Sequence, residues 1–190
     1  MSYTSIMSAL HKVRGFASDR RGVSAIEFAI IAPLMITLYL GGVEVSQAVA
    51  VNRKTTLVAH TVADLVAQTS SVANSDMTDV LNASSSVAAP YSVANLSVTV
   101  SSVVINSSGV AKVSWSDTMH GTARAVGSTI TLDPALAVPN TSLILGEVSY
   151  SYKPTFGWVI TGTLTLSDKT YLRPRITQCV NRPPVVTACP

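Results

Sequence analysis

The stretch of sequence that decides the fold runs Arg20-Arg-Gly-Val-Ser-Ala-Ile-Glu-Phe-Ala-Ile-Ile-Ala-Pro-Leu-Met-Ile-Thr-Leu-Tyr-Leu-Gly-Gly-Val43. From Val23 onward, its only charged side chain is Glu27. About 20 predominantly apolar residues are enough to cross the hydrocarbon core of a bilayer as a helix. Residues 23–43 are therefore predicted to form a transmembrane helix.

The net charge of +3 lies in the residues before this helix. Residues 1–22 hold four basic side chains and one acidic side chain, whereas the nine basic and nine acidic side chains of the remaining chain cancel. Basic flanks stay on the cytoplasmic side of a membrane, so the N-terminus is expected in the cytoplasm and the chain after about residue 45 outside it. Because the rest of the chain has no surplus of positive charge to attract phosphates, nucleic acid is not expected as a partner.

The helical pattern continues beyond the apolar stretch. Val51, Val58, Val62 and Leu65 follow one another at spacings of seven, four and three, which places them on one face of a helix. Neither Gly nor Pro occurs between Glu44 and Ser71. We therefore expect one helix over about 23–69, with an amphipathic second half.

From Leu96 the apolar period changes to two, which is typical of strands. A hairpin is predicted over 96–116, with further strands over 146–152 and 158–166, a long loop over 117–142 and a short helix near 76–82. The fold class is α+β, a long N-terminal helix followed by a small antiparallel sheet. The expected parts are a basic leader (1–22), a transmembrane segment (23–43), a periplasmic extension of the helix (44–71), a Ser/Ala-rich connection (72–95), a β-rich domain (96–175) and a C-terminal tail (176–190).

Glu27 stands out on physical grounds. A carboxylate inside a membrane span costs about 2.5–3.5 kcal/mol on insertion scales, and such residues usually mark a function. Glu27 either reaches water at the cytoplasmic interface or is neutralised by a partner. The position of Gly22 directly after two arginines, with Phe28 next to the acid, favours the second interpretation.

The segment Arg21-Gly-Val-Ser-Ala-Ile-Glu-Phe-Ala-Ile-Ile-Ala-Pro33 resembles the type IV prepilin processing site in its short Flp/Tad form. Together with Val148-Ser-Tyr-Ser-Tyr-Lys-Pro154 and Tyr171-Leu-Arg-Pro-Arg175, it makes the chain similar to the TadE/TadG-like family of minor pseudopilins of tight-adherence (Flp) pili. Larger TadG-type members add a von Willebrand A-like domain. This chain is too short for that domain and shows no Asp-x-Ser-x-Ser motif, so it resembles TadE more closely.

The resemblance implies a minor pilin that helps to assemble Flp/Tad (type IVb-like) pili used for surface adherence. Prepilin peptidase would cut between Gly22 and Val23, which puts Glu27 at mature position five, where it would pair with the new α-amine of a neighbouring subunit. Phe28 and Pro33 belong to the same motif. The implied partners are prepilin peptidase, the major Flp pilin, other minor pilins and the inner-membrane assembly platform. The implied location is the inner membrane with a periplasmic head, or the extracellular pilus.

Two other classes of protein stay open. Ala48-Val-Ala50 offers an Ala-x-Ala site for signal peptidase, which would release an exported binding protein beginning at Val51. An uncleaved single-pass anchor carrying a periplasmic or surface binding domain would begin at Met1 or Ser2.

The remaining candidate residues favour neither a cofactor nor catalysis. Cys179 and Cys189 are expected to form a disulfide outside the inner membrane, the alternative being two free buried thiols. The histidines show no metal-ligand spacing, so neither a metal nor a cofactor is expected. Ser116, Asp117 and His120 lie close in sequence but lack a Gly-x-Ser-x-Gly motif, so we expect no enzyme.

Overall fold

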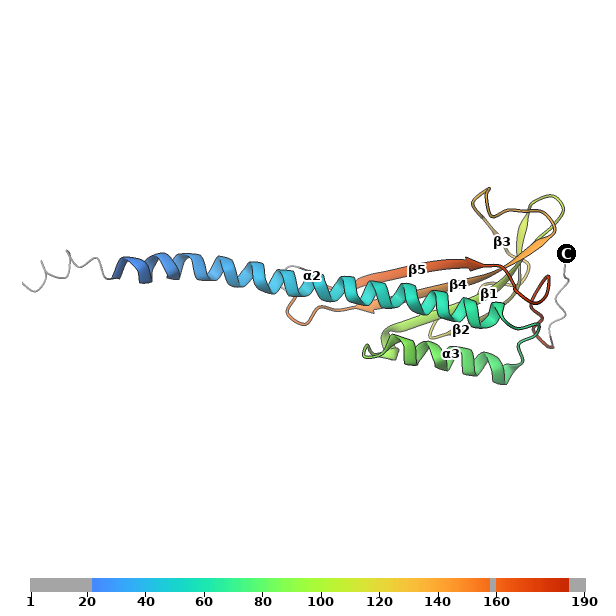
Figure 1. Cartoon of the computed structure of the whole chain (residues 1–190), viewed down its shortest axis with the longest axis horizontal. Helices are drawn as coiled ribbons and strands as arrows, with labels where there is room; N and C mark the ends of the chain where they lie inside the picture. The colour runs from blue at the N-terminus through green and yellow to red at the C-terminus, as the bar shows by residue number, and fades with distance from the viewer. Residues whose placement is uncertain (1–21, 158–159, 185–190) are drawn as a thin grey trace, which may run out of the picture. The chain divides into compact units, whose positions relative to one another are not determined.

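A single long helix, α2 (Val23–Ala67), opens the computed structural model, which describes residues 22–157 and 160–184. The chain divides into two units, Met1–Val43 and Glu44–Pro190, and α2 begins in the first and ends in the second (Figure 1). Pro33 lies inside the helix. In membrane helices such prolines are tolerated because neighbouring groups satisfy the freed carbonyl.

The second unit contains a five-stranded antiparallel sheet in the order β3-β2-β1-β4-β5 (Figure 1). A long apolar helix followed by a small antiparallel sheet confirms the predicted α+β fold class. The elements that follow α2 in the chain are α3 (Asn74–Ala88), η2 (Val93–Asn95), β1 (Leu96–Ile105), β2 (Ala111–Met119), β3 (Thr129–Ile130), β4 (Thr141–Tyr152) and β5 (Leu164–Leu172).

The main core lies between the helices and one face of the sheet, which we call the inner face. From Ala48 on, α2 contributes a row of fully buried small side chains, and α3 contributes Met77 and Ala88. The β-strands supply every second residue to the same core, because side chains alternate between the two faces of a strand. The buried residues of this core on the strands are Leu96, Val98, Val100, Trp115, Ile144, Val148, Tyr150 and Tyr152.

A smaller apolar cluster covers one end of the opposite, outer face. It joins Val103 and Ile105 of β1 to Leu143 and Leu145 of β4, with Ile130 of β3 packed on them. The register between β1 and β2 shifts at Ser102/Val103. This irregularity sends Trp115 to the inner core and Val113 to the outer cluster, although two positions along a regular strand would share a face.

Several elements differ from their sequence-based expectations. Strand β4 begins at Thr141, five residues before the strand expected over 146–152, because residues 141–145 pair with β1. Helix α3 is longer than the short helix expected near 76–82, because Met77 and Ala88 at its two ends both pack into the core. The strand expected over 158–166 was wrong in position: β5 begins at Leu164, and residues 160–163 belong to the preceding loop. Trp158 lies outside the described residues.

The C-terminal segment has no long strand among its described residues, but it makes specific contacts with the rest of the unit up to Arg182. Asn181 pairs with Ser71 in an isolated parallel bridge. The indole Nε1 of Trp115 donates to the carbonyl of Val180 at 2.8 Å. Arg182 donates to both carboxylate oxygens of Asp117 at 2.8 and 3.1 Å and to Asn74 Oδ1 at 2.7 Å. The segment thus ties the start of α3 to β2.

Candidate processing and assembly site

The predicted processing site lies at the exposed beginning of α2. Gly22 is exposed and immediately precedes the helix, and a Cβ added there would meet no atom within 4 Å. Val23 is the first helical residue and is 47% exposed. The backbone at the expected cut is therefore accessible, and the first four N–H groups of α2 have no partner within the helix.

Glu27 lies one helical turn beyond Val23, on the same side of α2. It is exposed, and its side chain makes no hydrogen bond or ion pair with any described residue. Apart from Ser24, the helix around it presents apolar side chains, including Phe28, which is 72% exposed. An acid on such a surface needs either water or an external cation.

Helix α2 is the one described helix that is long and apolar enough to cross a membrane. Its most apolar window has a mean hydropathy of 2.0 and contributes nothing to the interior of the structure. Within it, the Thr37 hydroxyl donates to the carbonyl of Pro33 at 2.8 Å, which gives the helix a polar contact close to its proline. An unburied apolar helix of this length has the properties of a lipid-facing or subunit-facing element.

A second acid, Glu44, lies one residue beyond the apolar stretch and has a very different environment. It is only 1% exposed, and its Oε2 accepts a hydrogen bond from the backbone N–H of Ile160 at 3.1 Å. Nearby, the phenol of Tyr152 donates to Gln47 Oε1 at 3.3 Å. Burial, and next the negative charge of Glu44, raise the pKa of Tyr152 above its ordinary value.

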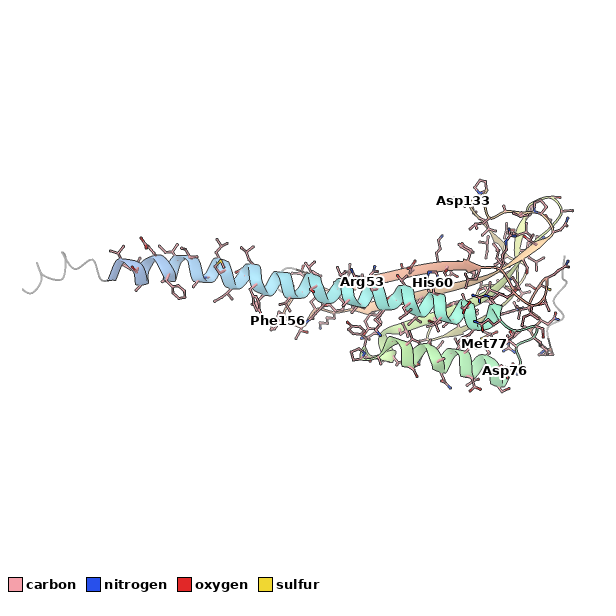
Figure 2. The ribbon with its side chains drawn as sticks, in the orientation of Figure 1. Arg53, His60, Asp76, Met77, Asp133 and Phe156 are labelled. Carbon is pink, nitrogen blue, oxygen red and sulfur yellow. The ribbon has the colours of Figure 1, made fainter. Side chains whose placement is uncertain are left out.

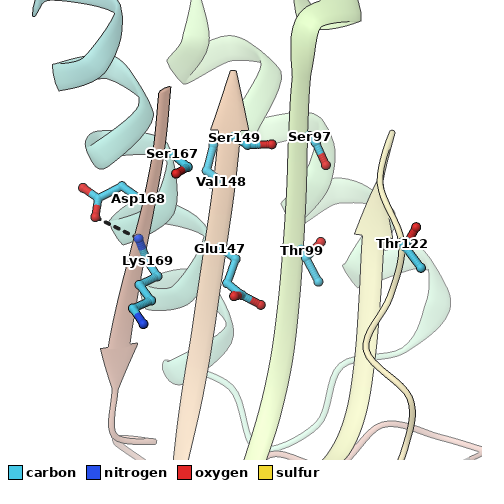
Figure 3. Close-up of a pocket in the computed structure, with 9 residues that line it drawn as sticks. All are labelled: Ser97, Thr99, Thr122, Glu147, Val148, Ser149, Ser167, Asp168 and Lys169. Atoms are coloured by element: carbon cyan, nitrogen blue, oxygen red, sulfur yellow. Dashed lines mark hydrogen bonds between the residues drawn. The ribbon is translucent and has the colours of Figure 1, made fainter. Parts of the chain in front are cut away.

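The outer face of the sheet carries a shallow polar groove beside the small apolar cluster (Figure 3). Its hydroxyls include Ser97 and Thr99 from β1 and Ser149 from β4. Glu147, which also lines the groove, forms a bidentate ion pair with Arg124 at 2.6 Å. The hydrogen bonds to Glu147 raise the pKa of Arg124. The groove presents hydroxyls, the carboxylate of Glu147 paired with Arg124, and the charged residues Asp168 and Lys169 of β5.

Ser116, Asp117 and His120 do not form a catalytic constellation. The Ser116 hydroxyl bonds to Ser101, while Asp117 lies on the inner face and pairs with Arg182. The His120 ring bonds to the carbonyl of Leu96 at 3.2 Å. Over the described ranges 22–157 and 160–184, no group of three metal-ligating side chains could hold an ion.

Cys179 is buried next to Val180. Cys189 lies outside the described residues, so the Cys179–Cys189 pairing stays a prediction.

Two functional contacts were missed by the sequence reasoning. The Glu44–Ile160 bond joins positions 116 residues apart, and the Arg182–Asp117 pair joins positions 65 residues apart. For Glu44 there was a signal, because an acid directly after an apolar span needs a partner if the helix packs there. For Arg182 the sequence offered none.

The family model described as TadE-like protein matches residues 22–64. The match covers less than half of the chain, begins at Gly22 and includes Glu27, Phe28 and Pro33, and it confirms the resemblance inferred from these residues. It indicates a function related to Tad pili for this chain. No curated protein and no solved structure matches the sequence.

Proposed function

We propose that the protein is a minor pilin of a Flp/Tad (type IVb-like) pilus, cut by prepilin peptidase after Gly22 and anchored in the inner membrane by α2, with residues 44–190 in the periplasm. It serves assembly and has no catalytic role. The observation that carries the proposal is Glu27: a solvent-accessible carboxylate, without a partner among the described residues, on the part of α2 over 23–43 that holds no other charged side chain.

The geometry at the start of α2 explains why cutting and assembly would be linked. Cleavage creates an α-amine at Val23, with an ordinary pKa of about 7.7–8.0, so it is cationic at neutral pH. Four residues of helix rise about 6 Å, which separates this amine from Glu27 by one turn. When two such helices lie side by side with a small axial offset, the amine of one faces the carboxylate of the other. Both charges are then neutralised in a medium that solvates neither.

The partners under this proposal are prepilin peptidase, the inner-membrane assembly platform, the major Flp pilin and other minor pilins. Phe28 and Pro33 would take part in recognition and helix packing. The exported-protein alternative is less favourable, because cutting after Ala50 would remove Glu44 and Ala48, which are both buried within the second unit.

N-terminal sequencing of the protein from a pilus-bearing host tests the processing step. We expect mature wild-type protein to begin at Val23 and Gly22→Ala to retain residues 1–22. A mature chain beginning at Val51 would support the exported protein, and one beginning at Met1 or Ser2 the uncleaved anchor. Either of these results would contradict the proposal.

Substitution of Glu27 tests the assembly step separately. We expect Glu27→Gln and Glu27→Leu to be cut normally but to be lost from sheared pili, as measured by mass spectrometry of the filaments and by pilus counts. Tyr39→Phe is the matched control, since it removes a polar group from an exposed position of the same helix that lies outside the motif. Normal piliation with both Glu27 variants would reject charge pairing.

A further inference from the structure

The loop between β4 and β5 (residues 153–163) combines exposed apolar surface with a single charge. The structure describes it over 153–157 and 160–163. Phe156 is 51% exposed, and Gly157 follows it with a φ of 67°, a backbone conformation that favours glycine and turns the chain back. Lys153, exposed at the start of the loop, is its only charged residue.

Both ends of this loop are tied to the first turn of α2 in the second unit. The backbone N–H of Ile160 donates to the buried carboxylate of Glu44 at 3.1 Å. Tyr152, directly before Lys153, donates through its phenol to Gln47 at 3.3 Å. The loop therefore stays at the level of residues 44–47 along the helix. Figure 2 shows Phe156 at one end of this unit and Asp133 at the other.

The level of Glu44 relative to a bilayer follows from sequence and helix geometry. The 21 residues from Val23 to Val43 form helix throughout, and at 1.5 Å per residue they extend about 30 Å, the thickness of the hydrocarbon core. Glu44 is the next residue. The headgroup layer occupies roughly another 5–7 Å on each side, so a group bonded to Glu44 lies at headgroup depth.

We propose that residues 153–157 of the β4–β5 loop form a second membrane contact, in which Phe156 enters the boundary between headgroups and acyl chains and Lys153 meets lipid phosphates. The inference rests on the proposed membrane anchoring by α2. A phospholipid surface fits this loop because an exposed aromatic ring and an exposed basic side chain, three positions apart in sequence, match the apolar and anionic layers of the interface. The consequence is a head held in one orientation on the membrane before assembly.

Fluorescence quenching in vesicles tests the contact. The full chain is reconstituted into vesicles of phosphatidylethanolamine and phosphatidylglycerol, with an environment-sensitive fluorescent amino acid installed at Phe156. A matched variant carries it at the exposed Asp133. At Phe156 we expect a blue-shifted emission, strong quenching by nitroxide-labelled lipid and a severalfold weaker quenching by iodide than at Asp133. Circular dichroism checks that both variants keep the wild-type fold.

The other outcomes separate the two proposals. If the protein floats with the vesicles but Phe156 is quenched by iodide as strongly as Asp133, the loop contact is wrong and the anchor stands. If Phe156 is shielded from iodide yet insensitive to the lipid quencher, a second copy covers the loop and the lipid contact is again wrong. If the chain does not float with the vesicles, the anchor fails, and the loop contact fails with it.

Discussion

At the scale of single residues, the two acids of α2 show how environment assigns different roles to one side-chain type. Glu27 is exposed on an apolar helix and makes no contact with the described residues, so its charge is available to an external cation. Glu44 is buried and bonded to Ile160, so its charge serves the fold of the second unit. Glu27 is therefore the acid to which we give the proposed role in assembly.

Tyr152 predicts how stability depends on alkaline pH. Its pKa is raised in the folded state, first by burial and second by Glu44. A raised pKa means that the neutral phenol is preferred in the folded protein. The stabilisation is complete below the unfolded pKa of about 10 and is lost as the pH rises through the higher folded value.

We expect the melting temperature of the detergent-solubilised protein to fall more steeply above about pH 10 in wild type than in Tyr152→Phe, which cannot ionise. Thermal unfolding followed by circular dichroism between pH 8 and 11.5 measures the difference. Identical alkaline slopes in the two proteins would show that Tyr152 does not couple ionisation to folding.

At the scale of elements, the contact between α2 and the sheet depends on the absence of a side chain at Gly146. A Cβ there would lie 2.7 Å from the carbonyl oxygen of Ala59 and 3.1 Å from the Cβ of Ala63. The first of these is backbone and cannot swing aside. Gly146 and the small residues of α2 together let the helix lie directly on β4, close to the centre of the sheet.

Gly146→Ala is therefore expected to destabilise the second unit by about 1–3 kcal/mol, the usual cost of overpacking a filled core. Chemical denaturation of the detergent-solubilised protein measures the loss. Gly42→Ala is the control, because a Cβ at that helical position meets nothing within 4 Å. A Gly146→Ala protein as stable as Gly42→Ala would mean that α2 does not approach β4 this closely.

At the scale of the whole molecule, the C-terminal segment of the second unit is held by residues distant in sequence. Arg182, near the C-terminus, reaches Asp117 on β2 and the carbonyl of Val72 before α3. The side chains of this ion pair are 10% and 28% exposed, so it is shielded from water more than the Arg124–Glu147 pair, at 39% and 27%.

Arg182 lies between the cysteines in sequence, and thiol titration of the unfolded, unreduced protein tests their predicted disulfide.

Removing the guanidinium of Arg182 should cost more stability than removing that of Arg124. We expect Arg182→Ala to lose about 3 kcal/mol, because the carboxylate of Asp117 is left without its partner in a partly buried site. Arg124→Ala, which breaks the more exposed pair, should lower the free energy of unfolding by no more than about 1 kcal/mol. Denaturant unfolding of both variants makes the comparison, and equal losses would contradict a special role for the C-terminal segment.

The long helix, the change to a two-residue period at Leu96 and the motif from Gly22 to Pro33 were all readable from the sequence. Each of these signals is local: about twenty consecutive apolar residues, an alternation along a strand, or a fixed spacing between a glycine, an acid and a proline. Local patterns of this kind do not depend on what the rest of the chain does. They were therefore sufficient for the α+β fold class and for the family resemblance.

The tertiary structure decided the features that depend on residues distant in sequence. The length of α3 follows from where its Met77 and Ala88 meet the core, the position of β5 from its pairing with β4, and the partners of Glu44 and Arg182 from the packing of the whole unit. No local pattern encodes these choices, because each contact forms only after the chain between its two residues has folded. The sequence by itself determined which helix and which acid to consider, whereas the three-dimensional packing decided which acid is left accessible.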